Sequence, residues 1–193
     1  MCMLELMHTA SLIHDDVVDS ADKRRNVPTI NATSGRQAAV QCGDYLLAKA
    51  MERLSLYRGS GINETLAQVS SEMCFGEFYQ QRTLFSLHAQ TLETYYDQIR
   101  RKTACLLPAS CYTGALSGRV SQEKAGYLAK YGEYLGLAFQ IKDDILDFCA
   151  DPGFGKKAGQ DLRNGIFTLP ILLVKEELRV RLFCGMNGGS RVL

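Results

Sequence analysis

The stretch His14-Asp15-Asp16-Val17-Val18-Asp19 closes an apolar run that begins at Met1 and carries almost no charge. In a helix, Asp15 and Asp19 lie four positions apart and share one face, with Asp16 beside them. Like charges at this spacing repel each other unless a cation lies between them. Taken alone, the stretch is more simply a solvated helix end than a metal site.

A second stretch far downstream repeats this pattern. Gln140-Ile141-Lys142-Asp143-Asp144-Ile145-Leu146-Asp147 closes a long amphipathic segment, and its first and last aspartates again share a helical face. If the two helices face each other, their six carboxylates form one acidic pocket that cations must neutralise. Carboxylate oxygens suit Mg²⁺, which usually binds one or two carboxylates together with substrate phosphates. The pair of motifs therefore predicts Mg²⁺ ions bridged by an anion.

Basic residues near the two motifs indicate that the anion is a polyphosphate. They are Arg24 and Arg25 after the first motif, Lys156 and Lys157 after the second, and Lys102 beside Thr103. Arginine and lysine are the usual partners of phosphate in proteins. Each of these residues alone is more simply a surface cation, but their placement favours a site that stabilises charge on a leaving phosphate.

Composition limits the class of protein. The chain has 193 residues, of which 46% are hydrophobic and 22% charged, and its net charge of +1 gives no sign of a nucleic-acid partner. Its seven cysteines form no C-x-x-C pair, so reduced, buried thiols and a cytoplasmic location are expected. The apolar N-terminal run lacks the features of a signal peptide and is too short to span a bilayer.

Helix-forming residues dominate the chain, which contains only four prolines, so an all-α fold is expected. Helices are expected to near Asp22, over 36–57, over 64–85 with Asn63 as cap, from Thr91 to Pro108, over 109–116, over 121–148 and from Thr168. Residues 23–35 and 151–155 are expected to be loops. The expected architecture is a helical bundle with its site between facing helices.

As an ordered set, these motifs resemble the trans-type (head-to-tail) isoprenyl diphosphate synthases, above all the long-chain heptaprenyl to decaprenyl diphosphate synthases. Besides the two aspartate motifs, the matching residues are Arg24-Arg25, Pro28-Thr29, Gly43-Asp44-Tyr45-Leu46-Leu47, Gly76-Glu77 with Gln80, Lys102-Thr103, Phe139-Gln140, Gly155-Lys156, Gly159, Asp161 and Thr168-Leu169-Pro170. The resemblance implies the all-α isoprenoid synthase bundle with a central cavity. It ends near residue 178, so residues 1–193 are expected to form a single, partial polyprenyl synthetase domain whose tail, 179–193, loses helical periodicity.

The resemblance also implies the metal and diphosphate ligands. Two to three Mg²⁺ ions are expected on Asp15, Asp19, Asp143 and Asp147, helped by Asp16 and Asp144. The cations expected to neutralise an allylic diphosphate (geranyl, farnesyl or geranylgeranyl) are Arg24, Lys102 and Lys156. By resemblance, isopentenyl diphosphate is bound by His8 and Arg25, and the reacting carbons are lined by Gln140 and Thr103.

The implied reaction is a Mg²⁺-dependent chain elongation by a prenyltransferase. The allylic C–O bond ionises, the alkene of isopentenyl diphosphate attacks the cation, and pyrophosphate leaves with a longer all-trans polyprenyl diphosphate as product. The growing tail must lie along the helix before Asp15, where Ala10 and Ser11 are small. A Phe or Tyr at either position would block the tail, so a product longer than geranylgeranyl is expected, and Ala10→Phe should shorten it.

Departures from the family pattern leave alternatives open. The basic Gly-Gly-Lys…Arg segment that precedes the first motif in the family is absent, and Ile166 and Phe167 stand where a lysine is common. The chain is therefore expected to be the central part of a synthase. The resemblance implies a homodimer for the full-length form, and loose membrane association for product release is left open. The alternatives are an inactive fragment, a regulatory subunit, a class I terpene cyclase, which Asp143-Asp144-x-x-Asp147 disfavours, and a di-iron protein, which lacks a second Glu-x-x-His pair.

Overall fold

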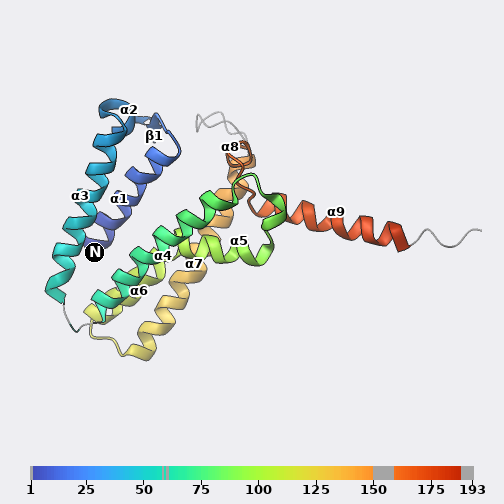
Figure 1. Cartoon of the computed structure of the whole chain (residues 1–193). Helices are drawn as coiled ribbons and strands as arrows, with labels where there is room; N and C mark the ends of the chain where they lie inside the picture. Colours follow the sequence, from blue (N-terminus) through green and yellow to red (C-terminus); the bar gives the residue numbers. More distant parts are fainter. Residues whose placement is uncertain (1, 58, 60, 150–158, 188–193) are drawn as a thin grey trace, which may run out of the picture. The chain divides into compact units, whose positions relative to one another are not determined.

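The computed structural model describes residues 2–57, 59, 61–149 and 159–187, with the backbone alone for 179–187. The described chain is almost wholly helical (Figure 1), which confirms the predicted all-α class. It divides into two compact units, one formed by Met1–Ser71 with Leu106–Gly132 and the other by Glu72–Cys105 with Glu133–Leu193. Two long helices, α4 (Ile62–Thr83) and α7 (Gln122–Phe148), contribute residues to both units.

In the first unit, two helices lie side by side (Figure 1), α1 (Cys2–Val18) and α3 (Arg36–Leu54). A glycine of α3 makes room for a side chain of α1 at this contact: a Cβ at Gly43 would lie 2.3 Å from Nε2 of His14. The shorter elements of this unit are β1 (Lys23–Arg24), β2 (Val27–Pro28), α2 (Ile30–Ser34), η1 (Ser55–Tyr57) and α6 (Leu106–Ser117).

The segment after the first aspartate motif differs from the expected loop. The helix ends at Val18 rather than Asp22, because Ser20 has a φ of 51° and the Ala21 N–H donates to the Asp16 carbonyl at 2.9 Å, as in a Schellman motif. A β-hairpin follows, whose turn residues Arg25 and Asn26 have φ values of 50° and 65°. Two consecutive positive φ values define a type I′ turn, which joins antiparallel strands tightly. Strands of two residues are too short to show alternation in the sequence.

The second unit packs α5 (Leu92–Ile99) against α9 (Leu169–Asn187). Its other elements are η2 (Leu87–Ala89), the π-helix η3 (Arg100–Ala104) and α8 (Gln160–Arg163), together with the second half of α4 and of α7. Tyr95, Ile99 and Leu172 form its buried core, and the partly buried residues packed against them are Leu87, Leu92, Leu137, Ile141, Phe167 and Leu169.

Several helix limits agree with the sequence, and others correct it. α5 begins next to Thr91, as expected, and the Thr91 hydroxyl caps it by accepting from the Thr94 N–H in a capping box. Asn63 is not a cap, since α4 already begins at Ile62. Pro108 does not end a helix, because it lies in the first turn of α6, where no N–H is required. The helical backbone of α9 continues to Asn187, which corrects the predicted loss of helicity after residue 178.

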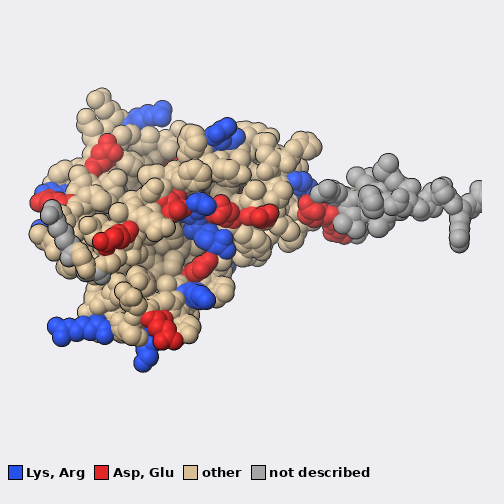
Figure 2. All heavy atoms as spheres, turned by 60° about the horizontal axis from the view of Figure 1, so that its bottom comes forward, with Lys and Arg blue, Asp and Glu red and all other residues tan. Residues whose placement is uncertain are grey.

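Charged side chains are mixed in sign on the surface, and exposed apolar side chains are concentrated on one helix. On the face drawn in Figure 2, acidic and basic side chains are interspersed and leave wide uncharged areas between them. Large exposed apolar side chains gather on α7, among them Tyr131, Tyr134 and Phe139. None of the described helices is long and apolar enough to cross a membrane.

Close packing against the π-helix predicts a sharp contrast between two glycines of α7. A Cβ at Gly136 would lie 2.8 Å from the Cβ of Ala104, whereas a Cβ at Gly126 meets nothing within 4 Å. Gly136→Ala should therefore lower the free energy of unfolding by about 1–3 kcal/mol. Gly126→Ala, the control, should raise it by up to about 1 kcal/mol through helix propensity. Chemical denaturation measures both, and equal effects would contradict the packing described for η3.

Candidate active site

The first aspartate motif lies at the C-terminal end of α1, and its three carboxylates differ in burial. Asp15 is half-buried, Asp16 is buried and Asp19 is exposed. The hairpin brings Arg24 back to the helix end, where its Nε lies 2.8 Å from Oδ1 of Asp16. The motif and one of its predicted cations are therefore joined by an ion pair, while Arg25 is exposed at the hairpin turn.

His14 contacts both residues of the Gly43-Asp44 match. Nε2 of His14 lies 3.3 Å from Oδ1 of Asp44 and 3.3 Å from the carbonyl oxygen of Val40. Glycine at 43 leaves room for this imidazole, which anchors α3 next to the aspartate motif. His14 was not among the predicted site residues, although it directly precedes the motif. His8, which was predicted to bind substrate, is half-buried on α1, seven residues before Asp15.

The second aspartate motif ends α7, and Asp144 is its buried member, with 2% exposure. The Tyr95 hydroxyl donates to Oδ2 of Asp144 at 2.5 Å, and Nε2 of Gln140 donates to Oδ1 at 2.7 Å. The backbone N–H of Leu169 also donates to this carboxylate. Burial raises the pKa of Asp144 above its ordinary value, and these donors offset only part of that effect. Burial, and then the bond to Asp144, raises the pKa of Tyr95.

The outer members of this motif are more accessible. Asp143 is exposed and Asp147 is half-buried. The Asp147 carboxylate accepts the backbone N–H groups of Gln160 and Asp161, both at 3.2 Å, so it is tied to the start of α8. The predicted cation Lys156, with Gly155 and Lys157, lies outside the described residues.

Lys102 of the π-helix η3 is held by two polar side chains of α4. Its Nζ lies 2.5 Å from Oε2 of Glu77 and 3.2 Å from Oε1 of Gln80, which also accepts from Gln98. A Cβ at Gly76 would lie 2.9 Å from the Lys102 backbone nitrogen, so only glycine lets α4 approach this closely. One arrangement thus accounts for the separate Gly76-Glu77, Gln80 and Lys102-Thr103 matches. Thr103 is half-buried beside Lys102.

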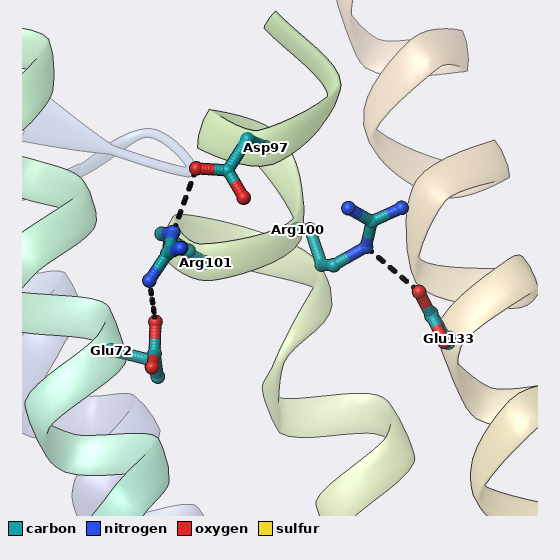
Figure 3. Close-up of polar contacts among 5 residues, drawn as sticks. All are labelled: Glu72, Asp97, Arg100, Arg101 and Glu133. Carbon is teal, nitrogen blue, oxygen red and sulfur yellow. Dashed lines mark hydrogen bonds and ion pairs between the residues drawn. The ribbon is translucent and has the colours of Figure 1, made fainter. Parts of the chain in front are cut away.

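The same π-helix is fixed on both sides by two arginines that no sequence motif singled out (Figure 3). Nε of Arg100 lies 2.8 Å from Glu133 of α7. Arg101 turns to the other side and pairs with Asp97 at 2.8 Å and with Glu72 of α4 at 2.5 Å. The pairs with Glu133 and Glu72 join residues far apart in the sequence, whereas Asp97 lies one helical turn before Arg101. π-Helical turns are frequent at functional sites.

The predicted site residues that the structure describes divide between the two units. The first unit holds His8, Asp15, Asp16, Asp19, Arg24 and Arg25, and the second holds Lys102, Thr103, Gln140, Asp143, Asp144 and Asp147. Among the described residues, no three His, Cys, Asp or Glu side chains converge closely enough to hold a metal by themselves. The accessible carboxylates Asp143 and Asp19 nevertheless fit Mg²⁺, which binds through few carboxylates and completes its shell with phosphate and water.

Comparison with known proteins gives a consistent result. The family profile described as "Polyprenyl synthetase" matches residues 1–181. The heptaprenyl diphosphate synthase component 2 of Geobacillus stearothermophilus is 44% identical over 179 residues, which cover 92% of this chain and 56% of that protein. The Bacillus subtilis protein of the same name is 40% identical, with 88% and 49% covered. The chain thus spans about half the length of these curated relatives.

Solved structures show the same likeness. The heptaprenyl diphosphate synthase of Staphylococcus aureus superposes with a TM-score of 0.86 at 38% identity, covering 91% of this chain and 55% of that one. A polyprenyl synthase from Caulobacter crescentus, complexed with calcium and isoprenyl diphosphate, gives a TM-score of 0.82 at 38% identity, covering 89% and 52%. The described helices therefore form the isoprenoid synthase fold.

The Asp16–Arg24 pair predicts unequal roles for two adjacent arginines of the hairpin. Arg24→Gln removes the cation that faces a buried carboxylate, so the free energy of unfolding should fall by about 1–2 kcal/mol. Arg25→Gln changes an exposed side chain of the same turn and should shift stability by less than about 0.5 kcal/mol. Thermal or chemical unfolding at low salt measures the difference. Equal losses in the two variants would show that the ion pair does not hold the hairpin.

Proposed function

Because the chain belongs to the polyprenyl synthetase family, we propose that it acts as a Mg²⁺-dependent, chain-elongating prenyltransferase. It condenses isopentenyl diphosphate with an allylic diphosphate and releases pyrophosphate. The observation that supports this most is the arrangement of the two Asp-Asp-x-x-Asp motifs. Each ends a helix, turns its second aspartate inward and leaves an outer aspartate accessible. Accessible carboxylates placed this way can bind the Mg²⁺ ions of a metal-bound diphosphate, whereas they add little to the packing of the helices.

The metal ligands proposed are the outer aspartates, Asp15, Asp19, Asp143 and Asp147, with Asp16 and Asp144 in support. Mg²⁺ bound there would neutralise the diphosphate and stabilise the charge that develops on the leaving pyrophosphate. The calcium and isoprenyl diphosphate named in the Caulobacter crescentus complex support a divalent-cation site, and two to three ions are proposed.

The chain's own cations hold the diphosphate in place. Lys102 is presented by the π-helix, and Glu77 keeps its ammonium group paired until a more highly charged diphosphate competes for it. Arg24 is oriented by Asp16 at the end of α1 and offers its remaining guanidinium N–H groups. Lys156 is proposed as the third cation. Isopentenyl diphosphate is assigned to His8 and Arg25, and the reacting carbons to Thr103 and Gln140.

We propose a homodimer in the cytoplasm, with loose membrane contact when the lipid-like product leaves. Six described cysteines are free, which fits a reducing compartment. A two-component synthase is the second candidate, because relatives bear the names "component 2" and "subunit 1". Analytical ultracentrifugation of the purified chain separates these arrangements. A homodimer sediments with twice the mass of the chain, whereas one component of a two-component synthase sediments as a monomer when its partner is missing.

Elongation activity tests the proposal directly. The chain is incubated with Mg²⁺, farnesyl diphosphate and labelled isopentenyl diphosphate, both alone and extended by the flanking segments of the Geobacillus stearothermophilus relative. A ladder of longer prenyl diphosphates is expected from the extended protein, and Lys102→Ala should lower its kcat/KM roughly tenfold to hundredfold through loss of charged hydrogen bonds to diphosphate. Lys130→Ala, on the exposed side of α7, is the control. A folded extended protein without turnover would overturn the function.

Product length provides a separate prediction. Ala10 is only 2% exposed, so a large side chain there would also disturb packing, whereas Ser11 is half-buried on the next position of α1. Ser11→Phe is therefore the cleaner way to narrow the space along the helix before Asp15. The extended protein should make products longer than geranylgeranyl diphosphate, and Ser11→Phe should shorten them. Chromatography of the dephosphorylated products measures their chain lengths. An unchanged length distribution would show that α1 does not line the space that the growing tail occupies.

A further inference from the structure

We propose that Tyr95 and Asp144 form a positioning pair that sets the direction of the second aspartate motif, and that Asp144 is not itself a metal ligand. This proposal rests on the proposed function, because the motif that the pair would position is the one assigned to Mg²⁺. Tyr95 belongs to none of the motifs that identified the family. Its role is inferred entirely from what its hydroxyl contacts.

Asp144 already accepts hydrogen bonds from three protein donors. Oδ2 accepts from the Tyr95 hydroxyl at 2.5 Å and Oδ1 from the Gln140 amide at 2.7 Å, and the Leu169 N–H provides a third donor. A carboxylate has about four lone-pair sites, so little of its capacity is left. Mg²⁺ demands near-octahedral geometry at short distances, and the three donors already bound leave little room around the carboxylate for it.

The surroundings of Asp144 are also unsuitable for a hydrated ion. Tyr95 is part of the buried core of the second unit, together with Ile99 and Leu172, and Ile141 of the same helix packs against that core. Asp144 points into this region with 2% exposure, whereas its neighbour Asp143 is exposed. An ion that lost its water there would be left among apolar side chains, which is costly.

The bonds to Asp144 instead fix the last turn of α7. Its donors come from three helices, because Tyr95 lies on α5, Gln140 on α7 and Leu169 at the start of α9. Successive residues of an α-helix are about 100° apart around the axis, so a side chain held inward at 144 sets the direction of its neighbours. Asp143 and Asp147, four positions apart, then share a face away from the core.

The first motif shows the same division of roles in the other unit. Asp16 is 7% exposed and is held by Arg24, whereas Asp15 is half-buried and Asp19 exposed. In both motifs the second aspartate is the inward one, although its partner is an arginine in one case and a tyrosine in the other. The recurrence indicates that the second aspartate of each motif is held by protein donors, while the outer aspartates are left to bind the metal.

Binding of Mg²⁺ with inorganic pyrophosphate, measured by calorimetry on the 193-residue chain, tests the pair. Tyr95→Phe and Asp144→Asn should each weaken Mg²⁺ affinity about tenfold, as loss of a group that orients a ligand does. The double variant should be no weaker than either single variant, because both remove the same interaction. Asp143→Asn should weaken binding in addition to Tyr95→Phe. Tyr96→Phe, which changes the adjacent exposed tyrosine, should bind as the wild type does.

Thermal unfolding without Mg²⁺ provides the second readout. Tyr95→Phe should lower the melting temperature by about 5 °C, since a buried carboxylate loses a donor, and Tyr96→Phe should leave it unchanged. Should Asp144→Asn not fold, Tyr95→Phe still carries the test because it removes a single hydroxyl.

Three results would overturn the proposal. Wild-type affinity in Tyr95→Phe combined with a large loss in Asp144→Asn would make Asp144 a ligand. Wild-type affinity in both folded variants would reduce the pair to a packing role. Additive losses in the double variant would separate the two residues. A wild-type chain that binds no Mg²⁺ with pyrophosphate overturns the metal site of the proposed function itself, a failure visible before any substitution is made.

Discussion

Three carboxylates within five residues repel one another, and both aspartate motifs have to satisfy this constraint. Each does so by turning its second aspartate toward protein donors: Asp16 toward Arg24, and Asp144 toward Tyr95, Gln140 and the Leu169 N–H. The remaining carboxylates are thereby separated from the buried one. The hairpin after α1 and the start of α9 both depend on these bonds, because each supplies one of the donors.

Lys102, one of the proposed diphosphate-binding cations, is positioned by close packing around the π-helix η3. Gly76 of α4 and Gly136 of α7 each leave room for the backbone of η3, where a side chain would collide with Lys102 or Ala104. Glu77 and Gln80 then receive the Lys102 ammonium group. A lysine held this way has little rotamer freedom left to lose, which would favour the proposed binding of a diphosphate.

Local signals accounted for most helices and for few of the contacts. The all-α class and the helix starts near Thr91 and just before Pro170 could be predicted, because proline, glycine and helix propensity act over a few residues. The hairpin could not be predicted, since its strands of two residues depend on the positive φ values of Arg25 and Asn26. Pro108 was misjudged as a break, because whether a proline begins or ends a helix depends on hydrogen bonds that its spacing does not reveal.

The sequence by itself determined the family and the positions of the acidic and basic residues, because motif order and spacing are properties of the chain alone. Only the tertiary structure decided which aspartate of each motif is buried. Tyr95 lies 49 residues before Asp144 and lacks any motif of its own, so no local pattern could link them. The direction of a side chain depends on the donors that packing brings to it, and these donors come from helices that meet only in the folded chain.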